Sequence, residues 1–214
     1  KDPLERIHYS WLAETIQNLE EEQQQLFSSC LSKNTSSSLH SYLKLSEIPS
    51  HYPEWFKNIV LEQLRNIAVP KDLCPIELLP QTPMSFLSNY SKQQLVVCIS
   101  LLGIADLASE LKKVLNSKVL SYTRKFLSPR QAHYFEFCLR AKQRLALKEP
   151  KLLPFINTPS KLPKALHLKG LQRFSLALQG ENKSFIWYIT RLLDKGRGML
   201  INNQIPEKNP QKVV

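Results

Sequence analysis

Prolines separate the apolar segments of this chain, and their placement constrains the fold more than any other feature. The chain has 14 Pro and only 5 Gly in 214 residues. Because Pro fixes φ and lacks an amide hydrogen, it is disfavoured inside helices and suits the connections between them. Mixed α/β enzymes need more glycine for tight turns and phosphate-binding loops. We therefore predict an all-α fold, an irregular multi-helix globular domain with Pro-rich connectors.

A connector at residues 68–90 holds four of the prolines and divides the chain. It separates a predicted N-terminal helical subdomain, residues 1–67, from a predicted main helical domain, residues 91–201. Residues 202–214 are rich in polar side chains, which is typical of a disordered tail. A single domain overall is the alternative.

Apolar spacing predicts helices in the N-terminal part. The segment after Pro3 carries apolar residues at helical spacing, and proline suits a first helical turn. The polar run SKNTSSS at 32–38 reads as a loop instead. Within the connector we expect Leu78, Leu79 and Phe86 to point toward the core.

The stretch QQLVVCISLLGIADLASELKKVLNSKVL is the most apolar part of the chain. Ser91 is predicted to cap a helix over 92–102, and Gly103 to end it as a C-terminal cap glycine. A second helix follows, with Asp106 and Glu110 on its outer side. The stretch is interpreted as helical core and not as a site of chemistry.

The sequence SPRQ at 128–131 is a helix-start signature. Its serine can cap the helix, its proline suits the first turn, and its glutamine can reach back to the cap. The helix is expected to continue to residue 147. Two later helices are predicted at 163–178 and before Gly196.

Charge is distributed unevenly along the chain, whose formal net charge is +11. Residues 1–107 hold 8 Lys/Arg and 12 Asp/Glu, a net charge of −4, whereas residues 108–214 hold 21 and 6, a net charge of +15. Such a contrast indicates that the C-terminal half meets something acidic. Nucleic acid, an anionic membrane surface and an acidic protein all qualify, as does a solvated basic surface without a partner.

A basic face is predicted within that half. Arg140 and Arg144 are one helical turn apart and would share a side of the helix. Between Arg140 and Arg173 the aromatic rings are those of Phe155 and His167, too few for base stacking along a nucleic acid. Contacts to phosphates alone stay open. The candidate partner-binding residues are Arg140, Arg144, Lys148, Lys164 and Lys169.

Catalytic and metal-binding motifs are not found in the sequence. It contains no P-loop, GxGxxG, HExxH or GxSxG motif. The four cysteines are isolated, which predicts neither a disulfide framework nor a zinc site and fits a reducing cytoplasm. Apolar neighbours should raise the pKa of Cys98 and keep it inert, and His8 is expected to pack at a helix edge. We predict no enzyme, cofactor or metal. We also predict no membrane span, because the longest candidate, residues 95–108, has 14 residues and contains Ser100 and Asp106.

Three segments resemble one protein family. IHYSWL (7–12) resembles the aromatic–His–Trp/Leu opening of the K-subunit of type III secretion sorting platforms, the SctK family. QLVVCISLLG (94–103) is similar to that family's apolar helix ending in Leu-Gly, and GLQRFSLALQGENKSFIWYITRLL (170–193) to its C-terminal helix pair. The segments occur in the family's order.

The resemblance implies a non-enzymatic, mostly helical adaptor that is cytoplasmic and peripheral to the inner membrane. Its implied partners are the cytoplasmic domain of the inner-membrane ring, the Q-type pod subunit and the L-type stator subunit. The family offers no catalytic residues to transfer. The alternative is a helical protein that binds nucleic acid through its basic C-terminal half.

Overall fold

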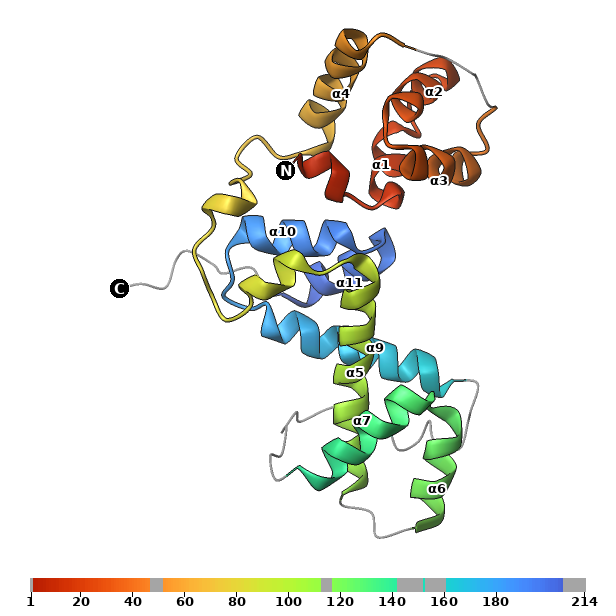
Figure 1. Ribbon diagram of the computed structural model, residues 1–214, viewed down its shortest axis with the longest axis vertical. Coiled ribbons are helices and arrows are strands. Elements are labelled where there is room, and N and C mark those ends of the chain that lie inside the picture. The colour runs from red at the N-terminus through yellow and green to blue at the C-terminus, as the bar shows by residue number, and fades with distance from the viewer. Residues whose placement is uncertain (1, 47–51, 113–116, 142–151, 153–160, 206–214) are drawn as a thin grey trace. The chain divides into compact units, whose positions relative to one another are not determined.

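The computed structural model describes residues 2–46, 52–112, 117–141, 152 and 161–205 (Figure 1). In this part of the chain there are ten α-helices, three 3-10 helices and no strand. The prediction of an all-α fold is confirmed.

The chain forms two compact units that differ from the predicted division. Unit 1 comprises Lys1–Tyr90 and Gly180–Met199, and unit 2 comprises Ser91–Gln179 and Leu200–Val214. The end of the predicted connector at residue 90 coincides with a boundary between the units. However, the connector itself belongs to unit 1, and so does the segment Gly180–Met199, which we had assigned to the main domain.

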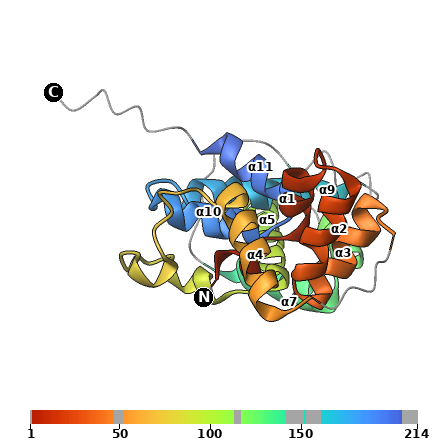
Figure 2. The ribbon, with the colours of Figure 1, turned by 90° about the horizontal axis from the view of Figure 1, so that it is seen from above.

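Unit 1 is built from short helices. Among its α-helices, α1, α2 and α3 pack on one another, and α4 packs against α1 and α2 (Figure 1 and Figure 2). The elements are η1 (Pro3–Arg6), α1 (Tyr9–Ile16), α2 (Glu21–Cys30), α3 (Lys33–Leu43), α4 (Glu54–Ala68), η2 (Ile76–Leu78), η3 (Ser85–Asn89), α10 (Lys183–Leu192) and the start of α11 (Lys195–Gln204). The buried core contains Leu4, Ile7, Trp11, Leu12, Ala13, Ile16, Leu39 and Leu64.

The predicted N-terminal helix is interrupted at His8. The Asp2 carboxylate caps η1 by accepting a hydrogen bond from the Leu4 amide at 3.0 Å. His8 is extended and serves as the N-cap of α1, where its Nδ1 accepts from the Ser10 amide at 3.3 Å. The His8 amide donates to the Arg191 carbonyl at 2.8 Å instead of continuing a helix. His8 therefore lies at the edge of α1, as expected, where its ring packs beside Tyr9 with ring centroids 4.2 Å apart, and it also caps the helix.

The loop predicted at 32–38 is wrong, because this run begins α3. Ser37 and Ser38 direct their hydroxyls to the carbonyls four residues earlier, at 2.9 Å each, so their side chains satisfy polar groups within the helix. Leu39 is fully buried in the unit 1 core. Burial of this apolar side of α3 outweighs the low helix propensity of its serines.

The connector prediction holds for one residue and is wrong for two. Leu79 is 9% exposed, but Leu78 is 73% and Phe86 51% exposed. Leu87, at 1% exposure, takes the inward position expected for its neighbour Phe86. A 3-10 helix has three residues per turn and occurs only in short pieces. The spacing of apolar residues in an α-helix or a strand therefore does not identify which residues of η2 and η3 point toward the core.

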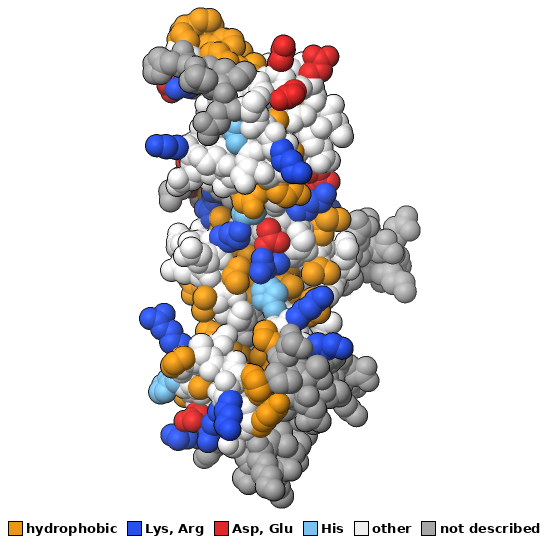
Figure 3. All heavy atoms as spheres, turned by 90° about the vertical axis from the view of Figure 1, so that its right-hand side faces the viewer, with side chains coloured by type: hydrophobic (Ala, Val, Ile, Leu, Met, Phe, Trp, Pro, Cys, Tyr) orange, Lys and Arg blue, Asp and Glu red, His pale blue; other side chains and the backbone are white. Residues whose placement is uncertain are grey.

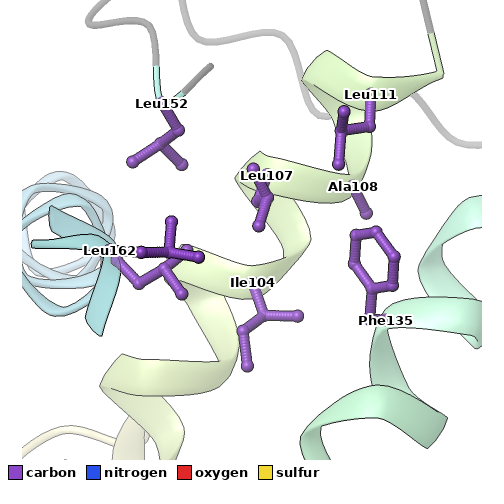
Figure 4. Packing of buried hydrophobic residues seen from close by; sticks show 8 residues of the cluster. Ile104, Leu107, Ala108, Leu111, Phe135, Leu152 and Leu162 are labelled. Atoms are coloured by element: carbon purple, nitrogen blue, oxygen red, sulfur yellow. The ribbon is translucent and has the colours of Figure 1, made fainter. Parts of the chain in front are cut away.

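Unit 2 is organised around one long helix. Helix α5 (Lys92–Leu111) is crossed by α9 (Leu162–Ala177) and packs against α7 (Pro129–Arg140), with α6 (Ser117–Phe126) preceding α7. Figure 4 shows Phe135 of α7 pointing toward Ala108 of α5, with Leu152 and Leu162 on the other side of α5. The buried cluster contains Ile104, Leu107, Ala108, Leu111, Phe135, Leu152, Leu162 and Leu166.

Helix α5 does not end at Gly103 as predicted. The capping box of Ser91 and Gln94 starts the helix as expected, but the helix continues to Leu111. A Cβ on Gly103 would lie 2.0 Å from the Leu166 carbonyl oxygen, and one on Gly170 would lie 1.8 Å from the Ile99 carbonyl oxygen. The two glycines are therefore needed for the backbones of α5 and α9 to meet, and not for a positive φ.

The continuous helix is longer than the apolar stretch 95–108, and it changes where Asp106 lies. Among the described residues, α5 is the one helix long and apolar enough to cross a membrane by length and composition, and 50% of the tested window is buried within the protein, as is common for core helices. Asp106 is not on an outer face: it is 4% exposed and paired with Arg173 of α9. The buried carboxylate belongs to the contact between the two helices.

The remaining predicted helix ends also differ. Helix α7 has the expected capping box of Ser128 and Gln131, but it ends at Arg140, and Ala141 is extended. The expected continuation of this helix to residue 147 is therefore wrong at residue 141. Residues 142–147 lie outside the described part of the chain. Helix α11 runs through Gly196 to Gln204, so residues 202–204 of the predicted tail are helical.

Candidate functional site

Three of the five predicted partner-binding residues lie in the described part of the chain, and two of these three are exposed. Arg140 at the end of α7 and Lys164 in the first turn of α9 are exposed. Lys169 was predicted to lie on the binding surface, but it is only 3% exposed, so this part of the prediction is wrong. Arg144 and Lys148 lie outside the described residues. Since α7 ends at Arg140, the helical face that Arg140 and Arg144 were expected to share is not formed by α7.

The structure shows a different exposed surface on α7. Arg130, His133, Phe137 and Arg140 are all exposed and follow one another at intervals of three, four and three residues. This spacing places them on one side of an α-helix. We call these four residues the α7 stripe. It combines two arginines and a histidine with the ring of Phe137.

The two faces of α7 are set by its sequence RQAHYFEFCLR. Phe135 is fully buried in the unit 2 core, whereas Phe137 is 65% exposed. A single exposed apolar side chain is common on protein surfaces. Phe137 differs in that it lies between Arg130 and Arg140 on the same side of the helix.

The helix that carries the stripe is fixed at both ends. The Ser128 hydroxyl accepts from the Gln131 amide at 3.4 Å, and the Gln131 side chain accepts from the Ser128 amide at 3.0 Å. At the other end, Lys112, the C-cap residue of α5, donates to the Ala141 carbonyl at 2.5 Å. The stripe is thus presented on a rigid element, which lowers the entropic cost of binding.

Glu136 moderates the charge beside the stripe. Its carboxylate lies 3.3 Å from Arg124 of α6 and 3.9 Å from Arg140. The Arg140 side chain remains 84% exposed, so a pair of this kind contributes at most about 1 kcal/mol and leaves the guanidinium available. The α7 stripe is therefore basic overall with one carboxylate at its edge.

A second aromatic ring supports Phe137. The Tyr134 ring is stacked on it, with ring centroids 6.4 Å apart. Burial and a hydrogen bond with Cys138 raise the pKa of Tyr134 to about 12, further above the physiological pH at which a tyrosine is already neutral. Tyr134 thus contributes an apolar, uncharged flank to the stripe.

The unit that carries the stripe is strongly basic. Unit 2 holds 18 Lys/Arg and 5 Asp/Glu, a net charge of +13, whereas unit 1 holds 11 and 13, a net charge of −2. On the face shown in Figure 3, hydrophobic side chains lie between Lys and Arg side chains. Cationic and apolar surface together suit a partner that is acidic and also offers apolar contacts.

The cysteines in the described part of the chain are free, and its potential metal-ligating side chains are scattered. No group of three His, Cys, Asp or Glu side chains among them could hold a metal ion. Burial raises the pKa of Cys98, as predicted, which keeps its thiol protonated.

The α7 stripe is not recognised when only the basic residues from Arg140 onward are considered. The aromatic residues that accompany the arginines precede this position, within RQAHYFEFCLR. The signal was present as the three-and-four-residue spacing of Arg130, His133, Phe137 and Arg140. What the spacing does not reveal is that Phe135 is the inward ring and Phe137 the outward one.

The comparisons with known proteins leave the resemblance to the SctK family as a prediction. No family model, curated protein or solved structure matches this chain.

Proposed function

We propose that this chain is a non-enzymatic adaptor that binds an acidic protein partner through the α7 stripe. One observation carries the proposal: Phe137 is 65% exposed between Arg130 and Arg140 on a helix fixed at both ends. Aromatic and arginine side chains supply most of the binding energy in protein interfaces. A net charge of +13 on the unit would steer an acidic partner toward this surface.

The carboxylate of Glu136 favours a protein partner over a phosphate backbone. It lies within 4 Å of Arg124 and Arg140, where it would repel a chain of phosphates. A protein surface can place a donor opposite Glu136 and carboxylates opposite the arginines. The mixed charge therefore supports recognition of a folded protein.

The resemblance to the SctK family supplies the proposed setting. There the adaptor is cytoplasmic, peripheral to the inner membrane, and links the ring to the pods and the stator of a type III secretion sorting platform. The acidic partner would be the cytoplasmic domain of the ring, the Q-type pod subunit or the L-type stator subunit.

The test is a pull-down of the tagged full chain from nuclease-treated lysate of the source bacterium, read by mass spectrometry. The wild-type chain should retain ring, pod or stator subunits. A variant with Phe137→Ala and Arg140→Glu should lose them while its helical circular-dichroism signal is unchanged. Lys164→Glu is the matched control, because it reverses one exposed charge of unit 2 outside the stripe.

If the variant with Phe137→Ala and Arg140→Glu recovers these subunits as well as the wild-type chain does, the α7 stripe is excluded as the docking surface. Loss of recovery by the Lys164→Glu control alone would move the surface to the start of α9. Recovery of none of the named subunits would remove the secretion-system setting.

A second candidate function is binding of single-stranded nucleic acid. The stacked rings of Tyr134 and Phe137 beside Arg130 and Arg140 favour it, because aromatic rings among cations can stack on bases. It predicts affinity for an oligonucleotide that falls steeply with salt. It also predicts tighter binding by Glu136→Gln, which removes the repelling carboxylate. A flat salt dependence would exclude this function.

A further inference from the structure

Unit 1 contains a hollow that the proposed function does not use. It has a volume of about 600 Å³ and lies between η1, the connector that carries η2 and η3, and α10. This volume is within the range of about 300–1,000 Å³ typical of ligand pockets. Its lining is mixed, with the aromatic rings of Phe86 and Phe185 and the charged side chains of Arg6 and Glu77.

The wall formed by the connector is held by its own hydrogen bonds. The Ser85 hydroxyl accepts from the Thr82 amide at 2.8 Å, and the Thr82 hydroxyl donates to Glu181 at 3.0 Å. The Ser88 hydroxyl donates to the Ser85 carbonyl at 2.7 Å. These bonds fix the loop before anything binds, which favours affinity because little ordering remains to be done.

Arg6 provides an anion-binding group at this hollow. One nitrogen of its guanidinium donates to the Ser88 carbonyl at 2.6 Å, which anchors the side chain. A guanidinium has five N–H donors, and within the described part of the chain Ser88 is the one hydrogen-bond acceptor that Arg6 has. Partial burial lowers the pKa of Arg6, with Tyr188 and Glu77 opposing the shift. A partly desolvated guanidinium with spare donors pairs strongly with a carboxylate.

The other lining residues narrow the class of ligand. Glu77 adds a negative charge to the hollow, so a ligand with several negative charges would be repelled. Phe86 is 51% exposed, so its ring offers apolar surface to a ligand, whereas Phe185 is 4% exposed and is packed inside the unit. The surroundings suit a ligand with a single negative charge attached to an apolar group.

We propose that this hollow binds a short peptide segment in which one carboxylate pairs with Arg6 and an adjacent apolar side chain contacts Phe86. The segment would belong to a partner protein, with the carboxylate supplied by an acidic side chain or by a chain end. The site lies wholly in unit 1, so it does not depend on the α7 stripe or on the proposed function.

The test is a titration of the ¹⁵N-labelled full chain, followed by amide NMR signals. The probes are N-acetyl-Phe-Asp-amide, its neutral isostere N-acetyl-Phe-Asn-amide, and N-acetyl-phenylalanine as a chain-end carboxylate. The aspartate probe should shift the amide signals of Leu79, Ser85 and Asn89, and should bind at least about fivefold more tightly than the isostere, a difference of about 1 kcal/mol. If N-acetyl-phenylalanine binds more tightly than the aspartate probe, the carboxylate of the natural segment is that of a chain end. If it binds more weakly, the carboxylate is that of an acidic side chain.

Variants separate recognition from folding. Arg6→Gln should abolish the preference for the acidic probes, whereas Lys183→Gln, an equal loss of charge at an exposed position of α10, should keep it. Glu77→Gln should tighten binding of the acidic probes by removing the repelling charge. If Arg6→Gln does not fold, Phe86→Ala replaces it, because this exposed ring can be removed without opening the core, and it should weaken all probes.

Equal affinity for the aspartate and asparagine probes would overturn the proposal. So would an absence of shifts at the lining amides, or an unchanged preference in Arg6→Gln. In those cases Arg6 only anchors the connector to η1.

Discussion

The two units hold their helices together in different ways. In unit 2 the backbones of α5 and α9 meet at Gly103 and Gly170, and a buried ion pair of Asp106 with Arg173 lies next to this crossing along both helices. In unit 1 backbones also approach closely at one point, where Gly198 of α11 meets the Thr190 carbonyl of α10, but the junction of α1 with α10 is made largely of side chains. The Trp11 indole donates to the Leu193 carbonyl at 3.0 Å, and Arg191 lies 3.6 Å above the Trp11 ring.

Because of this difference, we expect different kinds of substitution to lower the stability of each unit. A crossing made of backbone cannot accept an added methyl group, because backbone atoms do not change rotamer. A junction made of side chains can adjust, so each loss there should cost less. The three tryptophans, Trp11, Trp55 and Trp187, all belong to unit 1. Tryptophan fluorescence therefore reports on unit 1, and far-UV circular dichroism on both units.

The largest effect is expected from Gly103→Ala. The added Cβ would lie 2.0 Å from the Leu166 carbonyl oxygen and 2.8 Å from its carbon, so α5 and α9 must separate. Because both clashing atoms are backbone, we expect the loss of unfolding free energy to reach or exceed the upper end of the usual about 1–3 kcal/mol for overpacking. Urea unfolding should show an early loss of circular dichroism while the fluorescence transition keeps its midpoint.

Gly196→Ala is the matched control. The nearest atom to its Cβ would be the Asp194 carboxylate oxygen at 3.5 Å, an ordinary contact. Because alanine is the better helix former, this variant should gain about 0.5–1 kcal/mol. A Gly103→Ala chain as stable as wild type would show that the helix crossing can widen without cost. A shift of both probes together would show that the two units unfold as one.

The second effect concerns the ion pair that accompanies the crossing. Asp106 is 4% exposed and its Oδ1 accepts from Arg173, whereas its Oδ2 has no hydrogen-bond partner among the described residues. Asp106→Asn removes the charge and keeps the shape, and should cost about 2 kcal/mol, the range of a hydrogen bond to a charged group. The loss should again appear in circular dichroism and not in fluorescence.

A double-mutant cycle sharpens this test. The pair Asp106→Leu with Arg173→Leu should cost less than the sum of the single changes, because each single change leaves the other group buried without its charge partner. Additive losses would mean that the two charges are not coupled.

The sequence predicts the helices and their caps better than it predicts how the helices meet. The capping boxes at Ser91 and Ser128 were found because all their groups lie within four residues. Gly103 was misinterpreted because its partner, Gly170, is 67 residues away, and a glycine in an apolar helix looks like a cap until the second helix is placed. Asp106 was assigned to the surface for the same reason.

The candidate site shows the same limit. The exposure of Arg140 and Lys164 follows from their charge, but the burial of Lys169 depends on where α9 packs. The assignment of Gly180–Met199 to unit 1 also depends on distant contacts, such as that of Trp11 with Leu193. Local periodicity carries no information on such pairs.

A smaller effect is expected at the side-chain junction of unit 1. The Arg191 guanidinium carbon lies 3.6 Å from the centre of the Trp11 ring and 5.8 Å from that of Trp187, and burial lowers the pKa of Arg191. Arg191→Met keeps the apolar stem and removes the cation, which should cost about 1–2 kcal/mol. This loss should appear in the fluorescence transition, the reverse of the result for Gly103→Ala. Lys183→Met, at an exposed position of the same helix, should leave that transition unchanged.

The smallest effect is a pH dependence confined to unit 1. Although burial alone would raise the pKa of Asp2, hydrogen bonds from Arg65 and the Leu4 amide, together with the Arg65 charge, lower it below its ordinary value. A carboxylate whose pKa is lowered on folding stabilises the folded state above its unfolded pKa of about 4, and this contribution is lost as the pH falls. Because the Asp2–Arg65 pair is partly exposed, its contribution should be below about 1 kcal/mol.

Asp2→Asn should therefore lower the fluorescence midpoint in urea at pH 6 and reduce its decline between about pH 5 and pH 3. Asp72→Asn, the same change at an exposed position of the connector, should leave the decline as in wild type. If Asp2→Asn declines as steeply as wild type, another carboxylate controls the acid sensitivity of unit 1. Any circular-dichroism transition that occurs without a change in fluorescence belongs to unit 2 and should be the same in all three chains, because the pair joins η1 to α4 within unit 1.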